Sequence, residues 1–166
     1  ALGMSLVYAN LLGGQDELIF DGNSFVLNHE GQVCAQLKHC EADLQIVDFI
    51  NGVPQASIVA ETMSVEAQIY RALVLGVRDY VTKNGFPSVL IGFSGGVDSA
   101  LTLAIAVDAL GVEKVRAVMM PSPYTADISW IDSRDMVKRL NVRYDEISIA
   151  PLFDGFKQAL SAQFEG

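Results

Sequence analysis

The chain has 166 residues, which fits one domain or a little more, and 51% of them are hydrophobic while 19% are charged. This composition, with a mean hydropathy of +0.31, provides for a substantial core. The formal net charge of −9 argues against non-specific binding to nucleic acid or to an anionic membrane, because both need a basic surface.

The first fifty residues carry short apolar runs of the β type. We expect strands at 5–9, 24–27, 33–35 and 44–47, with the turn at 28–31 closing a hairpin. The run at 6–9 is typical of a core strand and not of a frayed terminus, which indicates a piece of a longer protein.

A helix is expected after a break at 51–54 and a linker or surface crossing at 55–63. Ser64 is the predicted N-cap, and apolar residues recur at helical spacing to about Lys83. Asn84-Gly85 ends the helix, since Pro87 follows. Its apolar stripe is either core or part of a subunit interface.

The second half alternates strand and helix. We expect strands at 89–93, 115–120 and 142–147, and helices at 98–110, at 130–140 and from about Pro151. Ser129 with Asp132 makes a capping-box-like start for the second helix. The alternation predicts a parallel sheet with helices on its faces and right-handed crossovers. The loops at 94–99 and 121–129 follow neighbouring strands, so they should border one ligand site.

The run Ser94-Gly95-Gly96-Val97-Asp98-Ser99 joins a buried strand to a helix and predicts a phosphate-binding turn for ATP. Two glycines let the backbone approach phosphate oxygens, and the first N–H groups of the helix are free to donate. A carboxylate beside phosphates needs a cation between them, so Asp98 is the candidate Mg²⁺ ligand. The full set of candidate nucleotide-binding residues is Gly92, Phe93, Ser94, Gly95, Gly96, Val97, Asp98 and Ser99.

This turn lacks the Gly-Lys-Ser/Thr of a Walker A loop and the third glycine of the dinucleotide fingerprint. It resembles instead the pyrophosphate-binding loop of the N-type ATP pyrophosphatases, which cleave ATP between the α and β phosphates. An ordinary glycine-rich turn would account for the glycines and serines, but it would leave Asp98 unexplained.

Two further segments resemble the glutamine-dependent NAD⁺ synthetase family. The run NLLGGQDELIFDGNS at 10–24 is similar to the end of its nitrilase-type glutaminase domain, and AVMMPSPYT at 117–125 is similar to its second synthetase strand and loop. The resemblance implies an α/β fold with a parallel doubly wound sheet of the ATP pyrophosphatase type, preceded by a β-rich remnant of a nitrilase-like αββα domain. It implies a glutaminase part at 1–54, a linker at 55–64 and the start of the synthetase domain at 65–166.

The activity that this resemblance implies is the ATP-dependent amidation of deamido-NAD⁺ to NAD⁺. An adenylated intermediate forms with release of pyrophosphate, and ammonia from glutamine then displaces AMP. ATP and Mg²⁺ are the implied cofactors, the substrates are small molecules, and a homodimer or larger assembly is expected.

No catalytic residue is assigned within this chain. The family's glutaminase Cys, Glu and Lys lie upstream of the matched segment, so neither Cys34 nor Cys40 is taken as a nucleophile. Both cysteines are expected to be reduced thiols, because no second Cys or His stands at ligand spacing. The chain shows no membrane span or signal peptide, and we expect a cytoplasmic protein that by itself lacks both complete activities.

Several polar residues have plain structural interpretations. His29 and His39 are expected at the surface, and Asp16, Glu17 and Asp21 are expected to tie a loop by hydrogen bonds. Trp130 either packs at the sheet edge or stacks on adenine. Three basic residues are expected to form exposed ion pairs, with phosphate contact as the alternative: Lys114, Arg116 and Arg134.

Two other functions were weighed. A different enzyme with the same loop, such as a GMP or asparagine synthetase or a tRNA-modifying enzyme, leaves residues 10–24 unexplained. A nucleotide-binding module without turnover leaves Asp98 unexplained.

Overall fold

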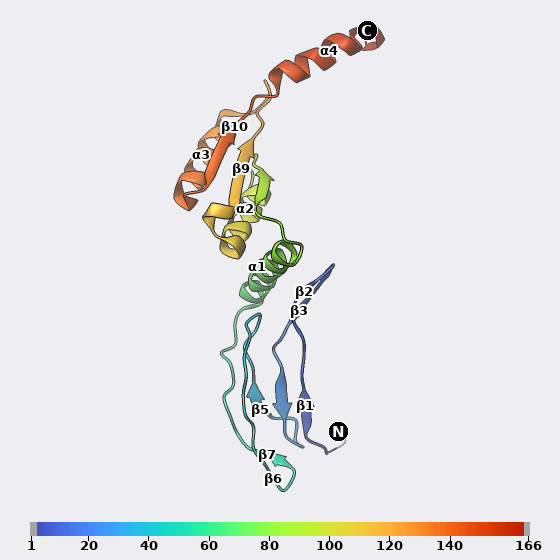
Figure 1. The fold of residues 1–166 in the computed structure, drawn as a ribbon, viewed down its shortest axis with the longest axis vertical. Coiled ribbons are helices and arrows are strands. Elements are labelled where there is room, and N and C mark those ends of the chain that lie inside the picture. The colour runs from blue at the N-terminus through green and yellow to red at the C-terminus, as the bar shows by residue number, and fades with distance from the viewer. Residues whose placement is uncertain (1–2, 165–166) are drawn as a thin grey trace. The chain divides into compact units, whose positions relative to one another are not determined.

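The computed structural model describes residues 3–164, which divide into two compact units between Lys83 and Asn84. The first unit is mostly β and ends with one long helix, whereas the second alternates strands and helices (Figure 1). The β-then-α/β order therefore agrees with the sequence patterns.

Three antiparallel strands form the sheet of the first unit. They are β1 (Leu6–Tyr8), β4 (Phe25–Leu27) and β5 (Val33–Gln36), in the order β1-β4-β5. Val26 faces Ala35 across the predicted hairpin, and both are buried. β1 forms where expected, but its side chains are exposed, so the core-strand interpretation is wrong for this sheet: β1 is an edge strand, with β4 as its one partner in the sheet.

Two tight hairpins were not predicted. β2 (Leu12–Gln15) and β3 (Leu18–Asp21) join at Asp16, whose φ is +52°, and β6 (Phe49–Ile50) and β7 (Val53–Pro54) join at Asn51-Gly52. Asn and Gly tolerate the positive φ that such turns require, so the break expected at 51–54 is the turn of a hairpin.

The strand expected at 44–47 is absent. Leu44 and Ile46 are 89% and 84% exposed, and residues 42–48 have no regular structure. Apolar alternation stabilises a strand only where its backbone pairs with another strand, and no strand within residues 3–164 pairs with this run.

The segment at 55–63 crosses the surface beside β5. Ser57 N–H donates to Cys34 O at 2.8 Å, and Gln36 N–H donates to Ile58 O at 3.1 Å. These backbone bonds attach the segment to the sheet, so it belongs to the first unit.

Helix α1 (Val65–Lys83) begins as predicted, because the Ala67 N–H donates to Ser64 Oγ at 3.2 Å. Leu75 and Val81 are buried, while Val65 and Ile69 of the expected apolar stripe are more than half exposed. The spacing of apolar residues therefore predicted the helix correctly, but it did not predict which side of the helix is buried.

Glycines bring α1 against the β2–β3 hairpin. A Cβ added to Gly14 would lie 3.4 Å from Gly76 Cα, and one added to Gly76 would lie 2.6 Å from a side-chain carbon of Ile19. At this contact the Gly14 N–H donates to Asp79 Oδ2 at 2.8 Å, and Lys83 Nζ donates to Gly14 O at 2.6 Å. The helix is thus held by polar contacts that only a close backbone approach permits.

We expect Asp79→Asn to lower the free energy of unfolding by about 1–2 kcal/mol at neutral pH, because the charge paired with Lys83 is lost. Burial disfavours the Asp79 carboxylate, but the Lys83 and Gly14 hydrogen bonds outweigh it and hold its pKa below the ordinary value of 3.8. The stabilisation is present above that value and disappears as the pH falls through the folded-state pKa. Thermal unfolding from pH 7 to pH 2 measures the difference.

Asp48 is exposed, so Asp48→Asn serves as the matched control. Its melting temperature should equal that of the unsubstituted chain at every pH. If the unsubstituted chain were still more stable than Asp79→Asn by the same amount at pH 2, the role given to the Asp79 charge would be contradicted.

The second unit contains a three-stranded parallel sheet (Figure 1). Its order is β10-β9-β8, with both pairs parallel. The elements in chain order are β8 (Val89–Gly92), α2 (Val97–Leu110), a short 3₁₀ turn η1 (Val112–Lys114), β9 (Val115–Met119), α3 (Asp127–Leu140), β10 (Arg143–Glu146) and α4 (Ala150–Phe164). The predicted parallel sheet is confirmed.

The core of this unit lies between one face of the sheet and two helices. Leu103 and Ala106 of α2 and Val137 of α3 pack with Val115 and Ala117 of β9. The other face carries Leu90, which is 64% exposed. The helical layer that the described residues establish is therefore the one formed by α2 and α3.

Helix α3 begins three residues earlier than predicted. Its N-cap is Ala126, which makes no side-chain cap bond, and the Ser129 N–H donates to Ala126 O at 3.0 Å. The capping box predicted from Ser129 and Asp132 is thus wrong, since Ser129 already lies within the first turn.

Candidate functional site

The turn between β8 and α2 is stabilised by its own two serines. Ser94 Oγ and Ser99 Oγ lie 3.1 Å apart, the Gly96 N–H donates to Ser94 Oγ at 3.3 Å, and Ser99 Oγ donates to Gly96 O at 3.0 Å. The Phe93 N–H donates to Val118 O at 2.8 Å and joins the start of the turn to β9. The hydroxyls of Ser94 and Ser99 therefore shape the loop.

Gly95 brings the turn into contact with α3. Its φ is +79°, and an added Cβ would lie 2.4 Å from Ser129 O and 2.9 Å from Ser133 Oγ. Ser133 is fully buried at this contact. No other residue type fits here without displacing either the turn or the helix.

The N-terminus of α2 opens to solvent from this turn. Its N-cap Gly96 makes no side-chain cap bond, and Asp98 in the first helical turn is exposed. The leading N–H groups of a helix have no intrahelical acceptor, so they can donate to an anion.

A pocket of about 310 Å³ adjoins the turn at the carboxyl ends of β8 and β9. Its lining comes from both expected loops and the strand ends before them: Gly92, Phe93, Ser94, Met119, Met120, Pro121 and Thr125. The two loops therefore border one pocket, as expected from the order of the strands.

Two of the three basic residues singled out in the sequence, both arginines, form ion pairs. Arg134 donates to both carboxylate oxygens of Glu146, at 2.7 and 2.8 Å, and its guanidinium carbon lies 5.0 Å from the ring centre of Trp130. The hydrogen bond from Arg134 lowers the pKa of Glu146. Arg116 pairs with Asp145. The expected ion pairs are thus present for both arginines, whereas Lys114 is exposed without one among the described residues.

Burial raises the pKa of the Tyr144 hydroxyl to about 12, and the nearby Glu146 carboxylate adds to the effect. Tyr144 therefore stays neutral across the physiological range, so it serves packing and hydrogen bonding and does not act as a base.

In the first unit the structure corrects the exposure expected of one histidine. His29 is 52% exposed as predicted, but the His39 side chain is only 11% exposed, and its Nε2 lies 3.3 Å from Asp21 Oδ2. Asp21 also accepts a 2.9 Å bond from Asn10 Nδ2, so it ties the loop as expected. Asp16 and Glu17 instead form an exposed hairpin turn.

Both cysteines are free, and burial raises the pKa of the Cys40 thiol. Within residues 3–164, no three His, Cys, Asp or Glu side chains gather closely enough to hold a metal ion. None of the described helices has the length and apolarity that a membrane crossing requires.

Sequence reasoning missed the role of Ser129 and Ser133. They lie one helical turn apart on α3 and face Gly95. Two small residues at i and i+4 on a helix are the signal that could have shown a close backbone contact.

The parallel sheet, the glycine turn and the pocket at the carboxyl edge define an α/β protein with a pocket at its strand ends, where such folds bind ligands. The sequence profile of the family described as NAD synthase matches residues 69–165. The chain belongs to this family.

The names of similar proteins support this family assignment. The chain is 44% identical to the glutamine-dependent NAD(+) synthetase of Acinetobacter baylyi over 96% of its length, and 47% identical to that of Rhodobacter capsulatus over 89%. It spans 30% and 27%, respectively, of those proteins. A solved structure of the Acinetobacter baumannii enzyme in complex with ADP matches 96% of the chain and 31% of that protein, with a TM-score of 0.92 and 44% identity.

We expect Gly95→Ala to lower the free energy of unfolding of the second unit by about 1–3 kcal/mol, because the added Cβ meets the backbone of Ser129 at a positive φ. Gly96→Ala is the matched control. Its Cβ would meet only Ser94 Oγ at 3.4 Å, and its φ is −81°. Thermal unfolding of both variants checks the difference, and equal melting temperatures would contradict it.

Proposed function

We propose that the chain is part of a glutamine-dependent NAD⁺ synthetase, which amidates deamido-NAD⁺ to NAD⁺ at the expense of ATP. The observation that carries this proposal is the 44% identity, over nearly the whole chain, to an enzyme of that name solved with ADP. No observation favours another pyrophosphatase-loop enzyme or a module without turnover.

The turn at 94–99 is the proposed phosphate site. Its backbone donors at the start of α2 would hold the pyrophosphate end of ATP, and the candidate residues remain Gly92 to Ser99. The adjoining pocket gives the rest of the nucleotide room next to Met119 and Thr125. Because the chain carries a net charge of −9, such local donors are its means of attracting an anion.

Asp98 is the proposed protein ligand of Mg²⁺. It is exposed on the first turn of α2, beside the N–H groups that would bind phosphate. A hard cation that keeps most of its water and phosphate ligands needs only one or two carboxylates from the protein, so a single Asp fits that donor set. The ion would neutralise charge on the departing pyrophosphate.

The chemistry proposed for the complete enzyme separates activation from amidation. A carboxylate oxygen of the nicotinate group attacks the α-phosphorus of ATP, the bond to the β-phosphate oxygen breaks, and pyrophosphate leaves. Ammonia then attacks the activated carbonyl, and AMP leaves with the carboxylate oxygen. Donors at the turn lower the first barrier by stabilising the charge on the leaving group.

The domain assignment is also a proposal. Residues 1–54 would be the end of a nitrilase-like glutaminase domain, 55–64 a linker, and 65–166 the start of a doubly wound synthetase domain. The glutaminase Cys, Glu and Lys would lie in the part of the protein before Ala1. A homo-oligomer remains the expected assembly.

The complete protein should convert deamido-NAD⁺ and ATP to NAD⁺, AMP and pyrophosphate, with either glutamine or ammonia as the nitrogen source. Separation of the nucleotide products by chromatography checks this. Formation of ADP and phosphate in place of AMP and pyrophosphate would rule out the proposed chemistry.

Asp98→Asn should weaken Mg²⁺-dependent ATP binding by about tenfold to a hundredfold, because the amide offers the ion no negative charge. Titration calorimetry with and without Mg²⁺ measures it. Asp108→Asn, further along the same helix, is the control. Unchanged binding by Asp98→Asn would remove its metal role.

A further inference from the structure

Two adjacent methionines lie at the carboxyl end of β9, and both line the pocket beside the turn at 94–99. Met119 is 2% exposed, whereas Met120 is 52% exposed. Successive side chains of an extended chain point to opposite sides, so one of the two enters the interior and the other stays open to solvent. The same short segment therefore offers a small oxidant one protected and one accessible methionine.

The sulfur of Met119 is engaged inside the protein. The Tyr144 hydroxyl donates to Met119 Sδ at 3.2 Å, and Met119 is among the largest fully buried side chains. Oxidation of a methionine requires that the oxidant reach its sulfur, so burial protects Met119.

Met120 instead lies over the end of β8. A Cβ added to Gly92 would lie 3.5 Å from Met120 Cε, so the methyl group of Met120 packs beside Gly92. Gly92 stands two residues before Ser94, where the turn begins, and Phe93 and Pro121 line the same pocket. Met120 is thus an apolar part of the wall next to the proposed phosphate site.

We propose that Met120 is a site of reversible oxidation by hydrogen peroxide, and that its oxidation lowers the affinity of this pocket for ATP. The inference rests on the proposed nucleotide site. A lone pair of the Met120 sulfur attacks one peroxide oxygen, the S–O bond forms, and the O–O bond breaks. The departing oxygen takes both peroxide protons and leaves as water. The sulfur is oxidised by two electrons to the sulfoxide, and the peroxide is reduced by the same two.

The sulfoxide changes the chemistry of the wall. Oxidation converts a flexible apolar side chain into a polar one, whose oxygen is hydrated in the open pocket. A nucleoside that covers this oxygen has to remove its water, which costs free energy unless a new hydrogen bond replaces it. The backbone donors of the turn are not altered, so binding of pyrophosphate alone should not change.

The test is treatment of the complete protein with hydrogen peroxide, followed by peptide mass spectrometry and titration calorimetry. Met120 should be oxidised at least about fivefold faster than Met119, and ATP should slow the oxidation of Met120 but not that of the 67% exposed Met4. Oxidation should weaken ATP binding by about threefold or more and leave pyrophosphate binding unchanged. Methionine sulfoxide reductases for both epimers should restore ATP binding, because the lesion is reversible.

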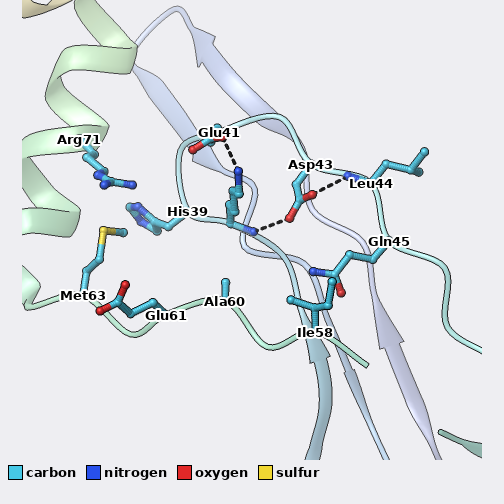
Figure 2. A pocket seen from close by; sticks show the side chains of 11 residues that line it. His39, Glu41, Asp43, Leu44, Gln45, Ile58, Ala60, Glu61, Met63 and Arg71 are labelled. Atoms are coloured by element: carbon cyan, nitrogen blue, oxygen red, sulfur yellow. Dashed lines mark hydrogen bonds and ion pairs between the residues drawn. The ribbon is translucent and has the colours of Figure 1, made fainter. Parts of the chain in front are cut away.

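Variants assign the effect to one residue. Met63 lines a pocket of the first unit, where Figure 2 shows it near His39, so Met63→Leu is the matched control. Affinities are compared before and after treatment of each variant. Met63→Leu should lose as much ATP affinity as the unsubstituted protein, whereas Met120→Leu should lose none on treatment.

Three results would overturn the inference: equal oxidation rates at Met119 and Met120, a loss on treatment that persists in Met120→Leu, or an equal loss of pyrophosphate binding. Unchanged ATP affinity after complete oxidation of Met120 would overturn it as well, while leaving the proposed nucleotide site intact. By contrast, absence of ATP binding before any treatment would overturn the nucleotide site, and this inference with it.

Discussion

The contact of Gly95 with α3 is the constraint on which the candidate site depends. The turn after β8 can reverse direction at this point only because Gly95 adopts a positive φ and has no Cβ to meet the Ser129 carbonyl. The next residue, Gly96, is the N-cap of α2 and has no side chain to cap it, so the first N–H groups of the helix remain available. The serines at 94 and 99 then bond to each other and to the turn, which fixes its shape before any ligand arrives. Preorganised donors of this kind need no rearrangement when charge develops.

A close approach permitted by glycine also occurs in the first unit, where it has a different role. Gly14 and Gly76 let a hairpin and a helix approach closely, and Asp79 and Lys83 then satisfy the exposed backbone of Gly14. In the second unit the close approach serves a site, whereas in the first unit it joins two elements. Glycine therefore marks close packing in both units, and only the neighbouring groups tell the two uses apart.

Much of the second unit could be predicted from the sequence, because buried parallel strands and their helices leave strong periodic patterns. Its three strands and the start of its phosphate-type turn lie within a residue or two of the expected positions. The first unit was harder, since strands of two to four residues carry little pattern. The run at 44–47 alternates like a strand but has no pairing partner among the described residues, whereas the hairpin at 12–21 was not predicted, although its residues carry the family resemblance.

By itself, the sequence determined the order of elements in the second unit, the glycine turn with Asp98, and the family, because these depend on local residue types and their spacing. Only the tertiary structure decided which side chains lie together. It placed Ser129 and Ser133 against Gly95 and turned His39 inward beside Asp21. It also laid Met120 against Gly92 in the pocket beside the turn. Such contacts join residues far apart in the chain, and their geometry depends on how helices and strands pack, which no local pattern records.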